Sequence, residues 1–359
     1  LMAYTTIDKP TDYFDTLTYT GNGNTNQEVN GLNFTPSYIW IKGRDTAHPH
    51  TNIDSVRGGN KYLKSNETGV EETDPQYGWI DSFDSDGFTT QIGSNSTPWN
   101  VNKNGETYVA WCWRTGTSFT NDASSTGVGT IDSSGSVNQD AGFSIVSFDL
   151  SGQSGNETIK HGLNTAPKVV ITKRRSGGAG DWTSYFGAIG NTYLVLSSTN
   201  AGATSTSFMN NTAPTSSVFT VGDPSWWGAN PFIAYCFAEK KGYSKFGSYI
   251  GNGNADGAFV YCGFRPAWVM IKRDGSGENW TIRDNKRDVS NVMTRALKPN
   301  LNAADGTGDG SEFSADFLSN GFKLRAASGH SNSSGQTNIF MAFAESPFVN
   351  SKSVPNNAR

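Results

Sequence analysis

Three stretches of apolar or alternating residues share one layout along this chain. Each begins with a proline and has a lysine six residues later, and the residues between them are largely β-branched or aromatic. Because proline cannot donate to a sheet ladder, it stands at the first position of a strand. Apolar runs of this length and composition are typical of half-buried or fully buried strands. We therefore expect three equivalent core strands, at Pro36–Lys42, Pro167–Lys173 and Pro266–Lys272.

Other elements recur around these strands in a constant order. An aromatic strand follows each of them, at 108–113, 232–237 and 340–345, and we align these strands on Ala110, Ala234 and Ala342. Gly/Asn turns at 19–24 and 249–254, and hairpin-type turns at 86–87 and 320–321, complete the pattern. Only 289–297 is a helix candidate. The sequence thus predicts an all-β fold of three tandem β-sandwich units (jelly-roll or concanavalin-like), each of about 100 residues.

The repeats divide the chain into six segments. Residues 117–139 are rich in Ser, Gly and Asp, which is typical of a linker. The polar ends of the chain are candidate docking arms for other proteins. The predicted segments are an arm (1–15), repeat 1 (16–116), the linker (117–139), repeat 2 (140–242), repeat 3 (243–348) and a tail (349–359).

Composition narrows the classes of partner. Charged residues are 17% of the chain and the net charge is −4, so nucleic acid is an unlikely partner. No apolar run approaches 18 residues, so we expect no membrane span. The cysteines show no metal-type spacing and are odd in number, which favours buried free thiols at Cys112, Cys236 and Cys262.

Two long phrases, 242–274 and 317–359, resemble a module common in structural proteins of tailed phages, particularly marine ones. The stretch Asp54–Gly58 of the first repeat fits the same pattern. The resemblance implies a virion protein, of the kind usually described as a tail fibre, that is assembled in the host cytoplasm and contacts other virion proteins. It also implies a homo-oligomer, for which a trimer is the favoured state. It brings no catalytic or binding residues with it, and the middle repeat departs most from the pattern.

The segment 222–231 is the most suggestive candidate for ligand binding. Trp226 and Trp227 stand between prolines and glycines, with Asp223 and Asn230 beside them. An exposed tryptophan can stack on a sugar face while neighbouring polar groups bond its hydroxyls. The four residues are therefore a candidate glycan site. The alternative is that both rings are buried at the end of a sandwich or in a subunit contact.

The segment 305–316 spaces oxygen-bearing residues in the manner of a calcium loop. Asp305, Thr307, Asp309 and Asp316 occupy the positions of ligands, and Gly310 that of the turn. The pattern departs from a calcium loop in its Thr307, in an Asp at the last position and in the absence of flanking helices. A solvated turn is the alternative, so we expect no cofactor other than this candidate Ca²⁺.

No motif of a catalytic site stands in its required context. The chain has no nucleophile elbow between a strand and a helix, and its clustered carboxylates fall in a turn. We therefore predict a protein that is not an enzyme, namely a tail-fibre or adhesin subunit that binds host-surface polysaccharide. The alternatives are a capsid decoration or assembly protein without glycan binding and, third, a polysaccharide depolymerase, since two carboxylates distant in sequence can meet in space.

Overall fold

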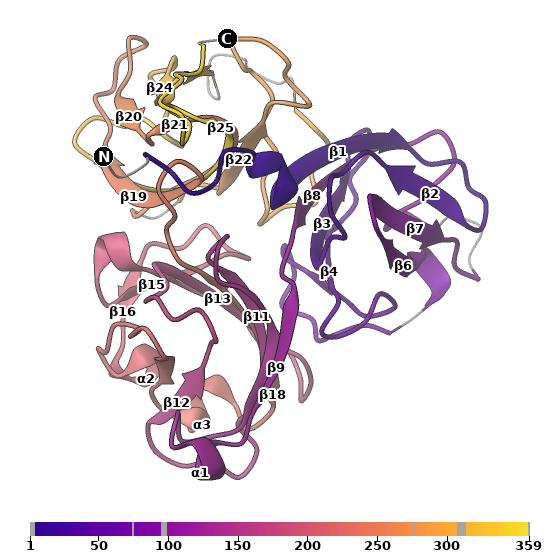
Figure 1. Cartoon of the computed structure of the whole chain (residues 1–359), viewed down its shortest axis with the longest axis vertical. Helices are drawn as coiled ribbons and strands as arrows, with labels where there is room; N and C mark the ends of the chain where they lie inside the picture. Colours follow the sequence, from indigo (N-terminus) through magenta and orange to yellow (C-terminus); the bar gives the residue numbers. More distant parts are fainter. Residues whose placement is uncertain (1–3, 74, 95–98, 276, 307–313, 358–359) are drawn as a thin grey trace.

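Antiparallel sheets make up nearly all the regular structure of this chain. The computed structural model describes residues 4–73, 75–94, 99–275, 277–306 and 314–357. Figure 1 shows three β-rich lobes around a common centre. The helices are single turns: η1 (Pro10–Asp12), η2 (Pro75–Tyr77), α1 (Ala123–Thr126), η3 (Gly187–Ile189), α2 (Thr206–Met209) and α3 (Pro224–Trp227). The prediction of an all-β fold is confirmed.

The strands fall into three consecutive groups, which we call units 1, 2 and 3. Unit 1 has β1 (Phe14–Thr20), β2 (Gln27–Asn30), β3 (Tyr38–Gly43), β4 (His50–Asp54), β5 (Tyr62–Lys64), β6 (Trp79–Asp84), β7 (Gly87–Gln91) and β8 (Thr107–Trp113). Unit 2 has β9 (Thr117–Asn121), β10 (Ser133–Asn138), β11 (Phe143–Asp149), β12 (Glu157–Lys160), β13 (Val169–Arg174), β14 (Trp182–Phe186), β15 (Thr192–Val195), β16 (Ala203–Thr204), β17 (Val218–Val221) and β18 (Pro231–Phe237). Unit 3 has β19 (Ser244–Ile250), β20 (Phe259–Tyr261), β21 (Phe264–Arg273), β22 (Thr281–Asp284), β23 (Ala315–Leu318), β24 (Gly321–Leu324) and β25 (Thr337–Pro347).

One order of strand pairing recurs in the three units. The large sheets read β1-β8-β3-β4-β5, then β16-β15-β14-β13-β18-β11-β10-β9, then β19-β25-β21-β22. The small sheets read β2-β7-β6, β12-β17 and β20-β24-β23. In each large sheet the last strand of the unit lies between the proline-led strand and an earlier strand. The three units therefore share one pattern of strand pairing in their large sheets.

The proline-led strands read as nearly continuous apolar runs because both of their faces are buried. One face packs against the small sheet of the same unit, as Ile39 and Ile41 of β3 do with Phe88 of β7. The other face points to a core that all three units share. This central core joins aromatic and aliphatic side chains of the three large sheets, among them Trp40, Trp111, Trp113, Ile171, Tyr235, Phe237, Trp268, Met270 and Phe343.

The lysine that ends each proline-led strand is fully buried in all three units. Its ammonium group donates to backbone carbonyls of the turn that follows, which satisfies a charge taken out of water. The Nζ–O distances are 2.5 Å from Lys42 to Gly43, 2.5 Å from Lys173 to Gly180 and 2.6 Å from Lys272 to Arg273. Lys173 also reaches Thr68 of unit 1, at 2.8 Å. Burial lowers the pKa of each lysine to about 8.

Each turn after a proline-led strand also docks on a neighbouring unit, so that the three units close a ring. An equivalent backbone hydrogen bond marks each contact. The three bonds run from Glu71 N to Arg175 O (3.0 Å), from Asp305 N to Arg44 O (2.7 Å) and from Gly202 N to Asp274 O (2.9 Å).

A chain of charged groups extends the contact between units 1 and 2. Arg175 forms a two-point ion pair with Glu71, at 2.9 and 3.1 Å. Glu71 also lies 3.4 Å from Arg57, whose Nε is 2.5 Å from the carboxylate of Asp54. The hydroxyl of Tyr235, on β18, donates to the same carboxylate at 2.7 Å. Arg57 and Asp54 are completely buried.

The contact between units 3 and 1 has the same chain of groups. Arg44 pairs with Asp305 at 3.0 Å, and Asp305 pairs with Arg287 at 2.9 Å. Arg287 lies 2.6 Å from Asp284, and the indole of Trp111, on β8, donates to Asp284 at 3.0 Å. Arg287 and Asp284 are also completely buried.

The contact between units 2 and 3 lacks these charges. By strand register, Phe186 takes the place of Asp54, because it pairs with the same position of the proline-led strand. Ile189, three residues on, takes the place of Arg57, and Met341 of β25 that of Tyr235. All three side chains pack in or against the central core. An apolar contact therefore replaces a buried ion pair, an exchange that proteins tolerate well.

The prediction that residues 117–139 form a linker is wrong. These residues form β9, the short helix α1 and β10, which extend the large sheet of unit 2. The small residues of β10 have a packing reason. A Cβ at Gly135 would lie 1.9 Å from the carbonyl oxygen of Ile145 on the neighbouring strand.

The predicted docking arms lie on their own chain over the residues that the structure describes. Ile7 is buried in the central core, and the hydroxyl of Thr5 donates to the carbonyl of Lys241 at 2.8 Å. Strand β1 begins at Phe14, inside the predicted arm. In the tail, the backbone N–H of Ser351 donates to Asp8 at 2.6 Å. These described parts of both arms therefore help to cover unit 3.

Two further expectations need correction. The segment 289–297 is not helical and instead makes single bridges, Ile282 with Leu297 and Met293 with Ala315. The alignment of the aromatic strands on Ala342 is displaced by two residues. Met270 pairs with Met341 as Trp40 pairs with Trp111, so Phe340 is the residue equivalent to Ala110.

Candidate ligand-binding site in unit 2

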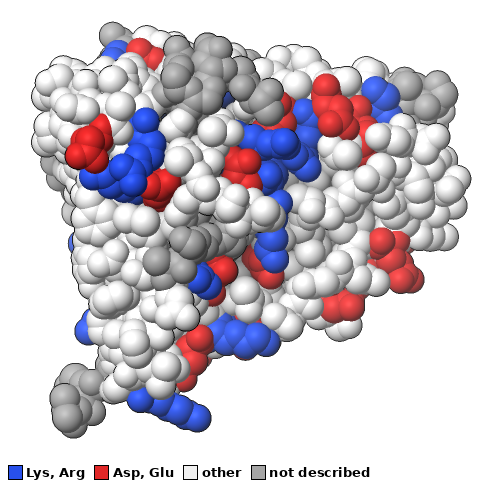
Figure 2. Space-filling model, turned by 90° about the horizontal axis from the view of Figure 1, so that it is seen from above, with Lys and Arg blue, Asp and Glu red and all other residues white. Residues whose placement is uncertain are grey.

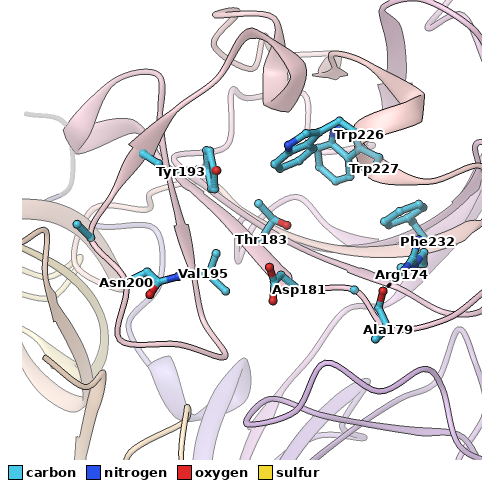
Figure 3. A pocket seen from close by; sticks show the side chains of 13 residues that line it. Arg174, Ala179, Asp181, Thr183, Tyr193, Val195, Asn200, Trp226, Trp227 and Phe232 are labelled. Carbon is cyan, nitrogen blue, oxygen red and sulfur yellow. Dashed lines mark hydrogen bonds between the residues drawn. The ribbon is translucent and has the colours of Figure 1, made fainter. Parts of the chain in front are cut away.

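A cavity of about 420 Å³ opens beside the large sheet of unit 2 (Figure 3). Its wall combines β13–β15 with the loop before β16 and with α3. Figure 3 shows aromatic side chains at one end and polar side chains along the rest of the wall. The lining residues are Arg174, Ala179, Gly180, Asp181, Thr183, Tyr193, Val195, Asn200, Ala201, Ala203, Trp226, Trp227 and Phe232.

The two tryptophans lie on α3, which begins with a strong local signal. Asp223 is its N-cap, and its carboxylate accepts from the backbone N–H of Ser225 at 2.9 Å. Pro224 is the first helical residue, a position where the missing N–H costs nothing. Successive side chains on a helix point about 100° apart, so neighbouring rings have different surroundings.

Trp227 is a core residue. It is 5% exposed, stacks on Phe208 at a centroid distance of 5.5 Å, and its indole donates to the carbonyls of Ser207 and Phe208. The expectation that Trp227 is exposed is therefore wrong, although Trp227 is among the residues that line the cavity. Trp226 is the exposed ring, at 41%. It meets Tyr193 edge to face at 5.5 Å.

Asp223 and Asn230 do not line the cavity. Asp223 is held by its role as the N-cap. Asn230 lies against the backbone of Gly177, where an added Cβ would be 1.8 Å from its side-chain oxygen. Sequence reasoning missed the polar wall, Arg174, Asp181 and Asn200, because these residues come from the end of β13 and from two loops that only the fold brings together. The Asp-Pro start of α3 was the readable signal for a helical turn.

Nearly the whole chain matches one protein family. The model of a family described as a domain of unknown function (DUF7483) matches residues 9–347. The chain belongs to the DUF7483 family. The match runs from the segment before η1 to the last residue of β25, so one DUF7483 domain contains all three units. No curated protein matches the chain.

The candidate calcium loop falls partly outside the described residues of this DUF7483 domain. Thr307 and Asp309 lie there, so the loop as a whole stays a prediction. Asp305 pairs with Arg44 and Arg287, and Asp316 lies 2.5 Å from Arg325. Among the described residues no group of three or more His, Cys, Asp or Glu side chains could hold a metal ion. These contacts favour a role for Asp305 in joining units.

The cysteines, the helices and the surface charges of the described residues complete the picture of this DUF7483 domain. The predicted buried free thiols are confirmed, and burial raises the pKa of all three. No helix in the described ranges is long and apolar enough to cross a membrane. On the face drawn in Figure 2, Lys and Arg lie beside Asp and Glu, and most of the surface carries no charge.

Proposed function

We propose that this DUF7483 protein is a subunit of a phage tail fibre or similar adhesin, and that unit 2 binds a host-surface glycan without cleaving it. The phage assignment is supported by the sequence resemblance. The glycan assignment is supported by one observation above all, the exposed ring of Trp226 at a cavity with a polar wall.

Trp226 differs from the other tryptophans of the chain. Among the described residues it is the one tryptophan that is more than about a third exposed. Together with Tyr193 it forms a rigid aromatic corner that loses little entropy when it stacks on a sugar ring. Asp181, Thr183 and Asn200 supply acceptors and donors for sugar hydroxyls.

Calorimetric titration of the full chain with host-surface polysaccharide tests the proposal. We expect saturable binding that Trp226→Ala lowers at least about tenfold, with an unchanged melting temperature. Ile250→Ala is the matched control, because Ile250 is 57% exposed and lies in unit 3, away from the cavity. Absence of binding by the folded chain, or equal loss in both variants, would refute the glycan site. A fall in polysaccharide viscosity on incubation would refute the non-enzymatic assignment.

A second candidate function, assembly without glycan binding, is favoured by the edge strand β20. Phe259 and Tyr261 project outward from it and are 46% and 53% exposed. The hydroxyl of Tyr261 lies 3.1 Å from that of Tyr4, and units 1 and 2 have no aromatic residue at the equivalent positions. The equivalent positions, by register, are Glu28 and Asn30 in β2, and Thr158 and Lys160 in β12.

This second candidate predicts that Phe259→Ser/Tyr261→Ser lowers the mass of the assembled protein. Light scattering of the chain at several concentrations measures it. A mass unchanged by the double substitution would rule out β20 as the assembly contact. In that case Trp226 keeps its proposed role, since the two surfaces lie in different units.

A further inference from the structure

The cavity of unit 2 contains an arginine that has no carboxylate partner among the described ion pairs. Most arginines of the chain pair with an acid, and Arg273, the residue equivalent to Arg174 in unit 3, lies 3.4 Å from Glu278. Arg174 instead donates from Nη2 to the backbone carbonyl of Ala179, while its buried Nε has no partner. A guanidinium group has five N–H donors, so donors remain for another acceptor.

Two glycines make room for this guanidinium group. A Cβ on Gly228 would lie 2.3 Å from Nη1 of Arg174, and a Cβ on Gly180 would lie 3.0 Å from Nε. Gly228 also has a φ of +91°, which disfavours other residues. The backbone at these glycines therefore leaves space that the guanidinium group of Arg174 fills at the cavity wall.

The second charged residue of the cavity, Asp181, forms no ion pair with Arg174 among the residues that the structure describes. Asp181 lies close enough to the buried Lys173 for its charge to oppose the fall in the pKa of that lysine. The guanidinium group of Arg174 is thus left without a carboxylate partner at the cavity wall. An anionic group would bind at the Arg174 end, and the Asp181 end would accept hydroxyl protons.

We propose that the cavity recognises an acidic sugar, with Arg174 bonded to the carboxylate of a uronic-acid-type residue and Trp226 against the sugar face. This inference rests on the proposed glycan-binding function and names its ligand class. Arginine is suited to this task because its planar fork matches the two oxygens of a carboxylate.

The experiment compares one host-surface polysaccharide preparation with two derivatives, one with its carboxyl groups reduced to alcohols and one desulfated. We expect carboxyl reduction to weaken calorimetric binding at least about tenfold and desulfation to leave it unchanged. Arg174→Gln should bind the native and the reduced preparations equally weakly. Arg114→Gln is the matched control, since Arg114 is exposed, lies outside the cavity and makes no described ion pair.

The outcomes separate this inference from the function on which it rests. Equal affinity for native and reduced preparations overturns the acidic-sugar inference and leaves glycan binding intact. Loss on desulfation alone also overturns it, in favour of a sulfated sugar. No binding to any preparation overturns both. A melting temperature of Arg174→Gln equal to that of the parent protein shows that the effect is on binding, because a merely structural arginine would lower stability.

Discussion

Removal of Arg287 tests how the units are held together. Arg287→Ala leaves the buried carboxylate of Asp284 with Trp111 and two backbone N–H groups as partners, and leaves Asp305 with Arg44. Burial opposes the charge of Arg287, but Asp284 and Asp305 outweigh it and keep the pKa of the guanidinium above its usual value. Breaking a buried pair from one side costs about 3–5 kcal/mol, because the other charge stays buried.

The measurement is urea denaturation followed by tryptophan fluorescence. The control is Lys9→Ala, which breaks an ion pair of similar length, 2.9 Å, between side chains that are 60% and 38% exposed. An exposed pair contributes about 0–1 kcal/mol, so the control should scarcely move the urea midpoint. Similar shifts in the two variants would refute the reasoning from burial.

A second experiment copies into this contact the apolar residues found at the contact between units 2 and 3. Asp284→Phe/Arg287→Ile introduces the residues found at positions 186 and 189. Because apolar groups of suitable volume often replace a buried ion pair without loss, the double variant should recover most of the stability that Arg287→Ala loses. A double variant less stable than Arg287→Ala would show that the space around Trp111 does not accept the larger ring.

Three further outcomes follow from the structure. Trp227→Ala should cost about 3–5 kcal/mol in thermal or chemical denaturation, whereas Trp226→Ala should be nearly neutral; the reverse order would contradict the burial of the two rings. The pKa of Lys173 is about 8 in the folded chain, below its unfolded value of 10.5, so the unfolded state binds more protons between these pH values. The stability of the parent protein relative to Lys173→Met should therefore rise between about pH 8 and 10.5 and should stay constant below pH 8. The measurement is the difference between the urea midpoints of the two proteins at several pH values. A difference that does not change with pH would refute this prediction. A thiol reagent at neutral pH should modify the folded protein at none of its cysteines and the urea-unfolded protein at all three, Cys112, Cys236 and Cys262.

The sequence predicted the fold class well and its connections less well. The proline-led strands were readable because two buried faces demand an apolar run between a proline and a lysine. The strand β10 was not recognised because its Ser and Gly residues resemble those of a linker. Gly135 lacks a side chain because the backbone of Ile145 lies against it, and this contact cannot be seen in the local sequence. The alignment on Ala342 failed because the residue equivalent to Ala110 is a phenylalanine, Phe340, with an alanine two positions further on, and only the pairing partner on β21 fixes the register.

Only part of the candidate site could be predicted from the sequence, for a similar reason. The tryptophan pair marks the place, but burial of one ring and exposure of the other depend on Phe208, which packs against both. Arg174 looks like an ordinary charged residue after a buried strand. Its lack of a carboxylate partner appears only when the loops around Gly180 and Gly228 are folded.

The shared central core also bears on the ancestry of the chain. A single unit standing alone would expose one entire face of its large sheet, with residues such as Trp40, Trp111 and Trp113 in water. Three separate copies of such a unit could bury that face by assembling around a threefold axis, each turn docking on the next copy. Fusion of three copies into one polypeptide would then free the contacts to diverge, as the apolar contact at Phe186 and Ile189 has done. The single polypeptide thus has the internal plan of a homotrimer.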